Sequence, residues 1–244
     1  METKELNCIE QRYREEYRQL HKSVCLNLGR IIWNIAFLKK AKEAQDLGVI
    51  CRNDFIIEHL YKNEFELLIL RLNRTFFDNG EDAATLPRLK NNLFSKYLLK
   101  QHKKGLSELL RDSTWDLPEI VAARRRLEDA VPIFRNNYIA HTLLVKNDEI
   151  SVSFLDAEKV IMAACELFNK LGYGLDTFYL NQEKFYLNFE EEKKACEKYY
   201  EQFFLFQQTS AFCIKNLQCE FNNDKSSKIV KEKIDKINLI LEEF

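Results

Sequence analysis

Glycine and proline are scarce in this sequence, and their scarcity constrains the fold more than any other feature. The 244 residues include only six glycines and three prolines, so there are few places where a helix must end or a tight turn must form. Hydrophobic residues make up 46% of the chain, which is enough for a sizeable core. We therefore expect a globular protein built from a few long helices.

Apolar residues recur every three or four positions along most of the chain, the pattern of amphipathic helices. The pattern predicts a long first helix that fades before Gly48 and a second helix that ends at 78–80 (DNG). Thr85 is expected to cap a third helix, with Pro87 in its first turn. Gly105 is expected to interrupt that third helix.

The fourth predicted helix begins after Asp116 and contains Pro132, which should kink it. The helical pattern then fails, and apolar residues alternate with polar ones over 150–154. Such alternation predicts a short extended or hairpin segment. Asp156 is expected to cap a fifth helix directly after it.

The last part of the chain, residues 176–244, contains no glycine or proline and has its own character. We predict a helix over 190–217, followed by a coiled-coil-like seam of about two heptads. The aromatic face of that helix is predicted to comprise Tyr199, Phe203, Phe206 and Phe212. The expected fold class is therefore all-α, with a helical bundle over 1–175 and a helical extension over 176–244.

Composition excludes several classes of function. The net charge of −1 does not indicate a general affinity for nucleic acid, so any anionic ligand must be held by a local patch. No apolar run approaches the roughly 18 residues of a membrane span, and Met1–Glu10 lacks the apolar core of a signal peptide. Seven cysteines without metal-ligand spacing predict reduced thiols in a cytoplasmic protein, with no metal and no cofactor.

A polar constellation lies at the predicted end of the fourth helix, in VPIFRNNYIAHT (131–142). Arg135 can bind a phosphate, and His141 can transfer a proton near neutral pH. The same loose spacing of arginine and histidine occurs in 14–21 and in 52–59, but there it lies among solvent-type residues. Only the third match has two amides beside the arginine, at the point where the helical pattern fails.

Geometry limits how Arg135 and His141 can cooperate. On a straight helix, six positions at about 100° each place them roughly 120° apart. They can meet only if the helix ends near Ala140, or if His141 faces the equivalent site of a second chain. The alternative is a surface helix end where both side chains are solvated or cap carbonyl groups.

The stretch RNNYIAH, with an apolar helix before it, resembles the arginine–polar–histidine motif of the HEPN superfamily, whose all-α domains include many ribonucleases. Two further stretches, LLILRLNRTFFD (67–78) and TLPRLKNNL (85–93), resemble the abortive-infection (AbiU-like) branch of that superfamily. The alternation over 150–154 and the helix after it also resemble the segments that come after the motif in that branch. The resemblance covers roughly residues 6–171.

This resemblance implies a metal-independent endoribonuclease of a phage-defence or toxin–antitoxin type. Its expected partners are RNA and, for a toxin, an antitoxin protein. Arg135 matches the family's arginine and would hold the phosphate, His141 matches its histidine and would carry the proton, and Asn136 could orient either. Arg124 lies eleven residues before Arg135, close to the same helical face, and is a candidate to extend a phosphate track. Some toxin members carry a modified tyrosine two residues after the histidine; Leu143 stands there, which puts that form of control in doubt.

The chemistry also favours a homodimer. Attack of a ribose 2′-hydroxyl on the adjacent phosphate needs a base and an acid, and one histidine cannot be both in the same step. A two-fold dimer would bring two copies of the motif into one cleft. The alternatives are a non-catalytic HEPN-like module that binds RNA, nucleotide or a partner protein, and a structural helical dimer in which the motif is incidental.

Overall fold

The structure, a computed structural model, describes the chain in stretches with gaps between them. These stretches are residues 8–47, 55–80, 83–136, 152–172, 179–180, 183–184 and 187–223. Within them the chain forms helices, short connections and one hairpin of two-residue strands. The all-α fold class is therefore confirmed, while the likeness to HEPN domains stays a prediction.

The described elements are mostly α-helices. In chain order the α-helices are α1 (Arg14–Asp46), α2 (Phe55–Leu72), α3 (Leu86–Asn92), α4 (Lys100–Leu110), α5 (Pro118–Phe134), α6 (Phe154–Gly172) and α7 (Phe189–Asn223). Short helical turns lie at Gln11–Tyr13, Asn73–Phe77, Leu93–Tyr97 and Thr114–Asp116. The strands β1 (Tyr179–Leu180) and β2 (Glu183–Lys184) pair antiparallel.

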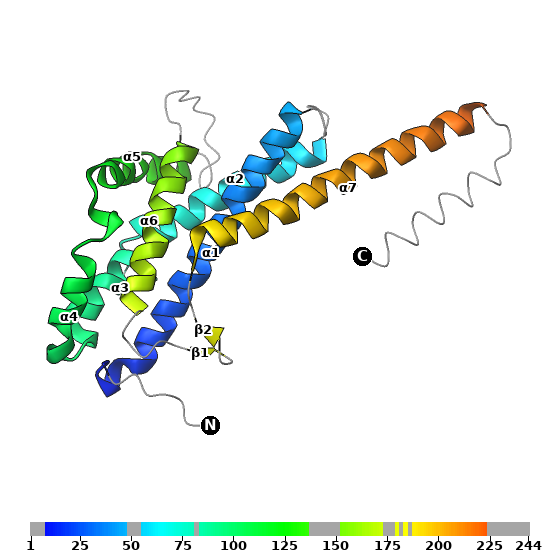
Figure 1. Cartoon of the computed structure of the whole chain (residues 1–244). Helices are drawn as coiled ribbons and strands as arrows, with labels where there is room; N and C mark the ends of the chain where they lie inside the picture. The colour runs from blue at the N-terminus through cyan, green and yellow to red at the C-terminus, as the bar shows by residue number, and fades with distance from the viewer. Residues whose placement is uncertain are drawn as a thin grey trace.

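The central helix is α1, and α2, α6 and α7 pack along it (Figure 1). Its buried positions recur every three or four residues, the spacing that places side chains on one side of a helix. They include Tyr17, Val24, Leu28, Ile31, Ile35 and Leu38. The predicted end of this helix before Gly48 is confirmed, because α1 ends at Asp46.

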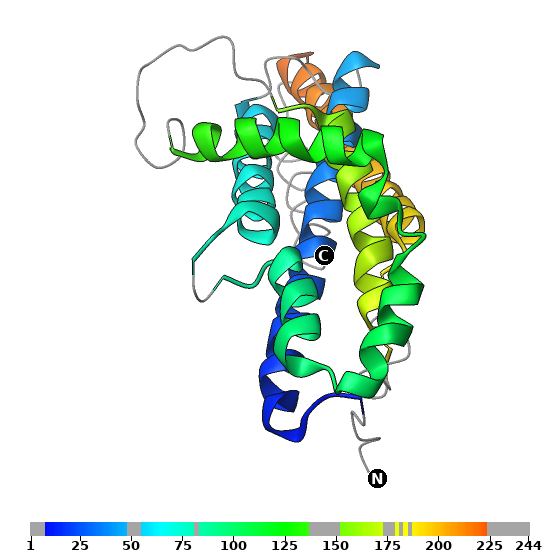
Figure 2. The ribbon, with the colours of Figure 1, turned by 90° about the vertical axis from the view of Figure 1, so that its left-hand side faces the viewer.

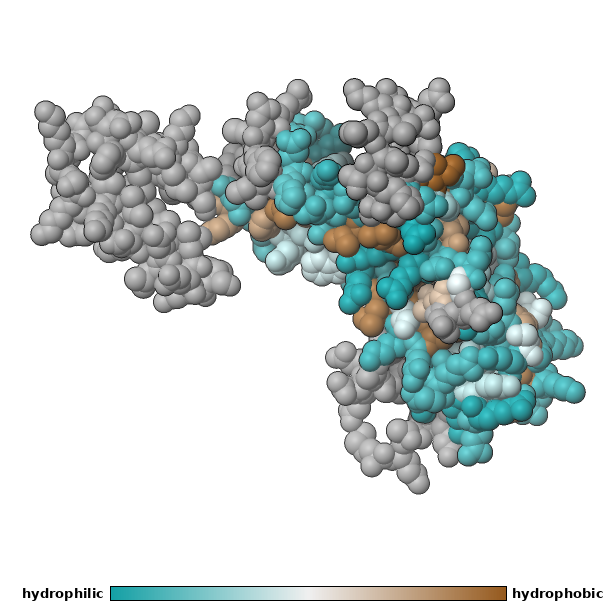
Figure 3. Space-filling view, turned by 180° about the vertical axis from the view of Figure 1, so that it is seen from behind, coloured by the Kyte–Doolittle hydropathy of each residue, from teal (hydrophilic) through white to brown (hydrophobic). Residues whose placement is uncertain are grey.

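The other helices surround α1 on different sides. Figure 1 shows α5 and α7 on opposite sides of α1, and Figure 2 shows α1 between α2 and α7, with α5 crossing in front. α6 packs against both α1 and α5, and its apolar face contributes Val160, Ala164 and Phe168 to the core. Seen from behind, the described surface is mostly hydrophilic, with hydrophobic residues in small separate groups (Figure 3).

The third helix begins as the sequence predicts. Thr85 Oγ1 accepts a hydrogen bond from the Arg88 N–H at 3.1 Å, and Pro87 lies in the first turn. The predicted interruption at Gly105 is wrong, because Gly105 lies inside α4. The break comes earlier, where the backbone of Leu98 is extended and pairs with that of Ile9. Pairing with the N-terminal segment, which local sequence does not reveal, takes this stretch out of the helix.

Two expectations about the start of α6 are corrected. Ser153, rather than Asp156, caps the helix, since Ser153 Oγ accepts the Asp156 N–H at 3.2 Å. Phe154, expected to end an extended segment, is the first residue of α6. The rest of that predicted segment, 150–151, lies outside the described residues, and the one described hairpin is the β1–β2 pair.

The aromatic face predicted for α7 is correct in part: Phe203 packs against the core, but Tyr199 and Phe206 do not belong to the buried stripe. Cys196 and Phe204 are buried, whereas Tyr199 is 55% exposed and Phe206 is 41% exposed. Tyr200 also turns inward, with its ring centroid 5.1 Å from that of Phe37. One position turns a helix by about 100°, so the contact with α1 selects the neighbouring stripe. The side chain of Phe212 and the predicted seam beyond Asn223 lie outside the described part of the chain.

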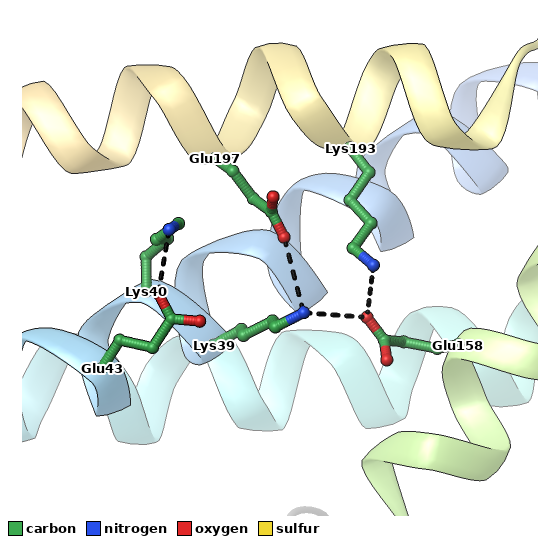
Figure 4. A network of polar contacts seen from close by, with 6 residues as sticks. All are labelled: Lys39, Lys40, Glu43, Glu158, Lys193 and Glu197. Atoms are coloured by element: carbon green, nitrogen blue, oxygen red, sulfur yellow. Dashed lines mark hydrogen bonds and ion pairs between the residues drawn. The ribbon is translucent and has the colours of Figure 1, made fainter. Parts of the chain in front are cut away.

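Ion pairs join α7 to α1 and α6 (Figure 4). Lys39 Nζ lies 3.9 Å from Glu158 Oε1 and 3.7 Å from Glu197 Oε1. Lys193 Nζ lies 3.0 Å from the same Glu158 oxygen. The first half of α7 therefore shares the core of the bundle, and the boundary placed between residues 175 and 176 stays a prediction.

Candidate functional site

Arg135 stands at the C-terminal end of α5. Its backbone N–H donates to the carbonyl oxygens of Val131 and Pro132. Its side chain is exposed, and Nη1 donates to Asn136 Oδ1 at 3.1 Å. Within the described ranges no ion pair holds the guanidinium. An exposed arginine with one amide neighbour is free to bind an anion bidentately.

His141 lies outside the described residues, so its distance from Arg135 is a prediction. The α-helix α5 ends at Phe134, two residues after Pro132, and a wider helical turn includes Arg135 and Asn136. The angle of roughly 120° expected between Arg135 and His141 on a straight helix stays a prediction.

The two ends of the chain segment that contains His141 are held close to each other. The ring of Phe65, on α2, lies 5.4 Å from that of Phe134 at the end of α5 and 6.0 Å from that of Phe154 at the start of α6. Phe134, at the end of α5, and Phe154, at the start of α6, therefore lie beside the same phenylalanine.

An ion pair reinforces the same junction between α5 and α6. The Arg126 guanidinium donates two hydrogen bonds to the Asp156 carboxylate, each of 2.7 Å. The Asp156 side chain is only 9% exposed, and the hydrogen bonds from Arg126 hold the pKa of its carboxyl below the ordinary value. Bidentate pairing of this kind fixes orientation as well as proximity.

Arg124, the fourth predicted site residue, is engaged elsewhere. Its guanidinium carbon lies 4.1 Å above the Trp115 ring, and Nη2 donates to the Trp115 carbonyl oxygen at 3.2 Å. Burial lowers the pKa of Arg124. Eleven residues of helix separate it from Arg135 by roughly 16 Å of rise. The structure does not bring the two arginines together, and the phosphate-track role of Arg124 stays a prediction.

The first of the other arginine–histidine matches lies among solvent-type residues in the sequence, but its histidine is buried. His21 is 1% exposed, and its ring centroid lies 4.3 Å from that of Phe168. Burial lowers the pKa of His21 to about 4, so the imidazole is neutral at physiological pH. His21 is therefore a core residue of α1, which removes 14–21 as a candidate site.

A polar cluster between α1 and α2 escaped the sequence analysis. Asn34 is fully buried; its side chain accepts a hydrogen bond from Arg71 Nη1 and donates one to Glu64. The signal was available, because Asn34 is the one polar residue in the apolar run IIWNIAFL (31–38). A buried amide in such a run needs partners, and here they come from α2.

Metal sites and membrane spans are both absent from the part of the chain that the structure describes. There, no group of three or more His, Cys, Asp or Glu side chains is arranged to hold a metal ion. No helix within the same ranges combines the length and the apolar character needed to cross a membrane. Burial raises the pKa of the Cys25 and Cys165 thiols to about 12, which makes both poor nucleophiles.

Comparisons with known proteins add no relative. No protein-family model, no curated protein sequence and no solved structure matches the chain. The function is therefore inferred from the site.

Proposed function

We propose that this protein is a metal-independent endoribonuclease of the HEPN type, acting in phage defence or as the toxin of a toxin–antitoxin pair. The observation that carries the proposal is the exposed guanidinium of Arg135 at the end of α5. It stands at the start of a segment that returns to Phe65 and whose sequence supplies His141. Such an enzyme would act on cellular RNA in the cytoplasm, and a toxin would bind an antitoxin protein.

The proposed reaction is transesterification within RNA. The ribose 2′-hydroxyl loses its proton to a base and attacks the adjacent phosphorus, while the 5′-oxygen of the next nucleotide leaves with a proton from an acid. His141 carries these protons. Arg135 binds the phosphate and stabilises the extra negative charge of the phosphorane, and Asn136 holds the Arg135 side chain. The products carry 2′,3′-cyclic phosphate and 5′-hydroxyl ends.

Homodimerisation forms part of the proposal. One histidine cannot accept and donate a proton in the same step, so two copies of His141 must face one cleft. The exposure of Arg135 at the C-terminal end of α5 supports this arrangement. A two-fold axis beside that end would bring both motifs together.

Substitution at the two motif positions tests the enzyme. His141→Ala should abolish RNA cleavage while leaving RNA binding nearly unchanged, since loss of a general acid–base lowers rates by about 10²–10⁴-fold. Arg135→Ala should weaken both, because its charge acts on the bound phosphate and on the transition state. Arg111→Ala is the matched control, since Arg111 is also an exposed arginine at a helix C-terminus, that of α4.

The readouts are the cleavage rate of a labelled RNA, the end groups of the products and the dissociation constant. Cleavage should persist in EDTA. Cleavage that survives His141→Ala, or that requires a divalent ion, would contradict the assignment. RNA binding without any cleavage would favour the non-catalytic HEPN-like module.

A further inference from the structure

A tryptophan on the central helix is partly exposed to solvent. Trp33 of α1 is 40% exposed, although aromatic rings of α7 stand beside it. The Trp33 ring centroid lies 5.7 Å from those of both Tyr199 and Tyr200, edge to face. Tyr199 is itself 55% exposed. Trp33 and Tyr199 together form an aromatic platform, held in place by Tyr200 beneath.

Two arginines stand beside the platform. Arg30 is exposed and lies three residues before Trp33, on the same side of α1. Arg71 reaches over from α2, and its Nη1 donates to the Arg30 carbonyl oxygen at 3.3 Å. Burial lowers the pKa of the Arg71 guanidinium, the charge of Glu64 opposes this shift, and the nearby charge of Arg30 adds to it.

The positive charge at this place is only partly compensated. Glu64 is the nearby acid, and its carboxylate accepts a hydrogen bond from the buried amide of Asn34. Within the described part of the chain, neither Arg30 nor Arg71 has a carboxylate oxygen within ion-pair distance. Asn34 instead holds Arg71 Nη1, which fixes the guanidinium beside the platform. The two neighbouring arginines therefore form a local concentration of positive charge in a chain whose net charge is −1.

We propose that the aromatic platform, together with Arg30 and Arg71, binds single-stranded RNA. Bases would stack on Trp33 and Tyr199, and the two guanidinium groups would contact phosphates, the combination that proteins use for unpaired strands. The uncompensated charge favours a polyanion over the apolar surface of a protein partner. The choice of RNA rests on the proposed ribonuclease function.

The platform is a separate surface from the motif. Its rings come from α1 and α7, whereas Arg135 stands at the C-terminal end of α5. Figure 1 shows α5 and α7 on opposite sides of α1. It would therefore retain a strand without taking part in the reaction. Its occupation can be measured independently of cleavage.

Tryptophan fluorescence provides the direct test. The chain has two tryptophans, and the other, Trp115, is only 4% exposed. A single-stranded oligouridylate is titrated into the His141→Ala protein, which should bind RNA without cutting it. Stacking on Trp33 should quench the emission to saturation. The quenching should vanish in the Trp33→Phe protein, where Trp115 alone emits, and a duplex RNA of the same length should quench far less.

Matched variants then separate the platform from other surface residues. Trp33→Leu should weaken binding of the oligouridylate by about 5- to 100-fold, the range expected for one lost stacking contact. Arg30→Gln should weaken binding of the oligouridylate. It should also reduce the slope of log affinity against log salt concentration by about one, the change expected when one phosphate contact is lost. The controls are Met162→Ala, an exposed apolar residue of α6, and Arg111→Gln on α4. Melting curves establish that each variant is folded.

The outcomes distinguish this inference from the proposed function. Saturable quenching would support RNA binding at the platform, and the absence of RNA cleavage by the wild-type protein would contradict the proposed ribonuclease activity. Cleavage without quenching, or equal weakening by platform and control variants, would overturn the platform. In that case a protein partner becomes the better occupant of the exposed rings.

Discussion

At the residue scale, His21 should make the protein sensitive to mild acid. Its folded-state pKa is lowered from 6.5 to about 4 by burial, so the unfolded chain binds a proton at a higher pH than the folded one. The stability that neutral His21 contributes is complete above pH 6.5 and is lost as the pH falls from there toward 4, by up to about 3 kcal/mol.

His21→Phe should remove this part of the acid sensitivity, because a ring that already lies against Phe168 would carry no titrating group. The free energy of unfolding in urea, measured at pH 7 and pH 4.5 for both proteins, checks the prediction. His102→Gln, in a partly exposed histidine of α4, is the control and should follow the wild type. Parallel losses in the wild type and His21→Phe would contradict it.

Residue-level prediction from the sequence succeeded where local pattern decides and failed where burial decides. Thr85 followed the rule for helix caps, and its hydrogen bond to Arg88 is present. The burial of His21 does not follow from its polar neighbours in the sequence, but it agrees with the spacing of four residues from buried Tyr17. Arg135 was identified from its neighbours, but its exposure needed the structure.

At the element scale, the buried stripe of α7 can be tested with two phenylalanines. Phe204 is 2% exposed and Phe206 is 41% exposed. Phe204→Ala should lower the free energy of unfolding by about 3–5 kcal/mol, because it leaves a cavity against α1. Phe206→Ala should cost less than about 1 kcal/mol. Chemical denaturation of the two variants measures the difference, and equal losses would mean that the other stripe packs inward.

The sequence predicted where the helices lie in the chain better than it predicted which side of each helix is buried. α7 is aromatic on more than one side, so its periodicity alone does not choose between the stripe with Tyr199 and the stripe with Phe204. The choice depends on partners such as Phe37 of α1, whose ring centroid lies 5.8 Å from that of Phe204. The ion pairs from Lys39 to Glu158 and Glu197 also orient α7. They join residues of three helices, so the pattern of one helix does not predict them.

At the scale of the whole molecule, the all-α class follows from composition and periodicity, but the arrangement does not. Residues 176–244 are expected to form an extension that packs on the bundle or on a partner chain, and α7 does pack on the bundle, along α1, which is far away in the sequence. The platform of Trp33 and Tyr199, with Arg71 beside it, combines three helices, which is why no local motif indicated it. A site formed by side chains from distant segments becomes visible only when the packing is known.

Two chains should be required for one cleavage event. If two copies of His141 act as base and acid in one cleft, only dimers with two wild-type chains are active. Wild-type and His141→Ala chains are co-expressed with different tags at known ratios, so that they assemble at random. Activity should then fall with the square of the wild-type fraction, to about a quarter for an equal mixture. Independent active sites would retain about half. Light scattering on the same samples should give the mass of a dimer, and a monomer with full activity would rule out the shared cleft.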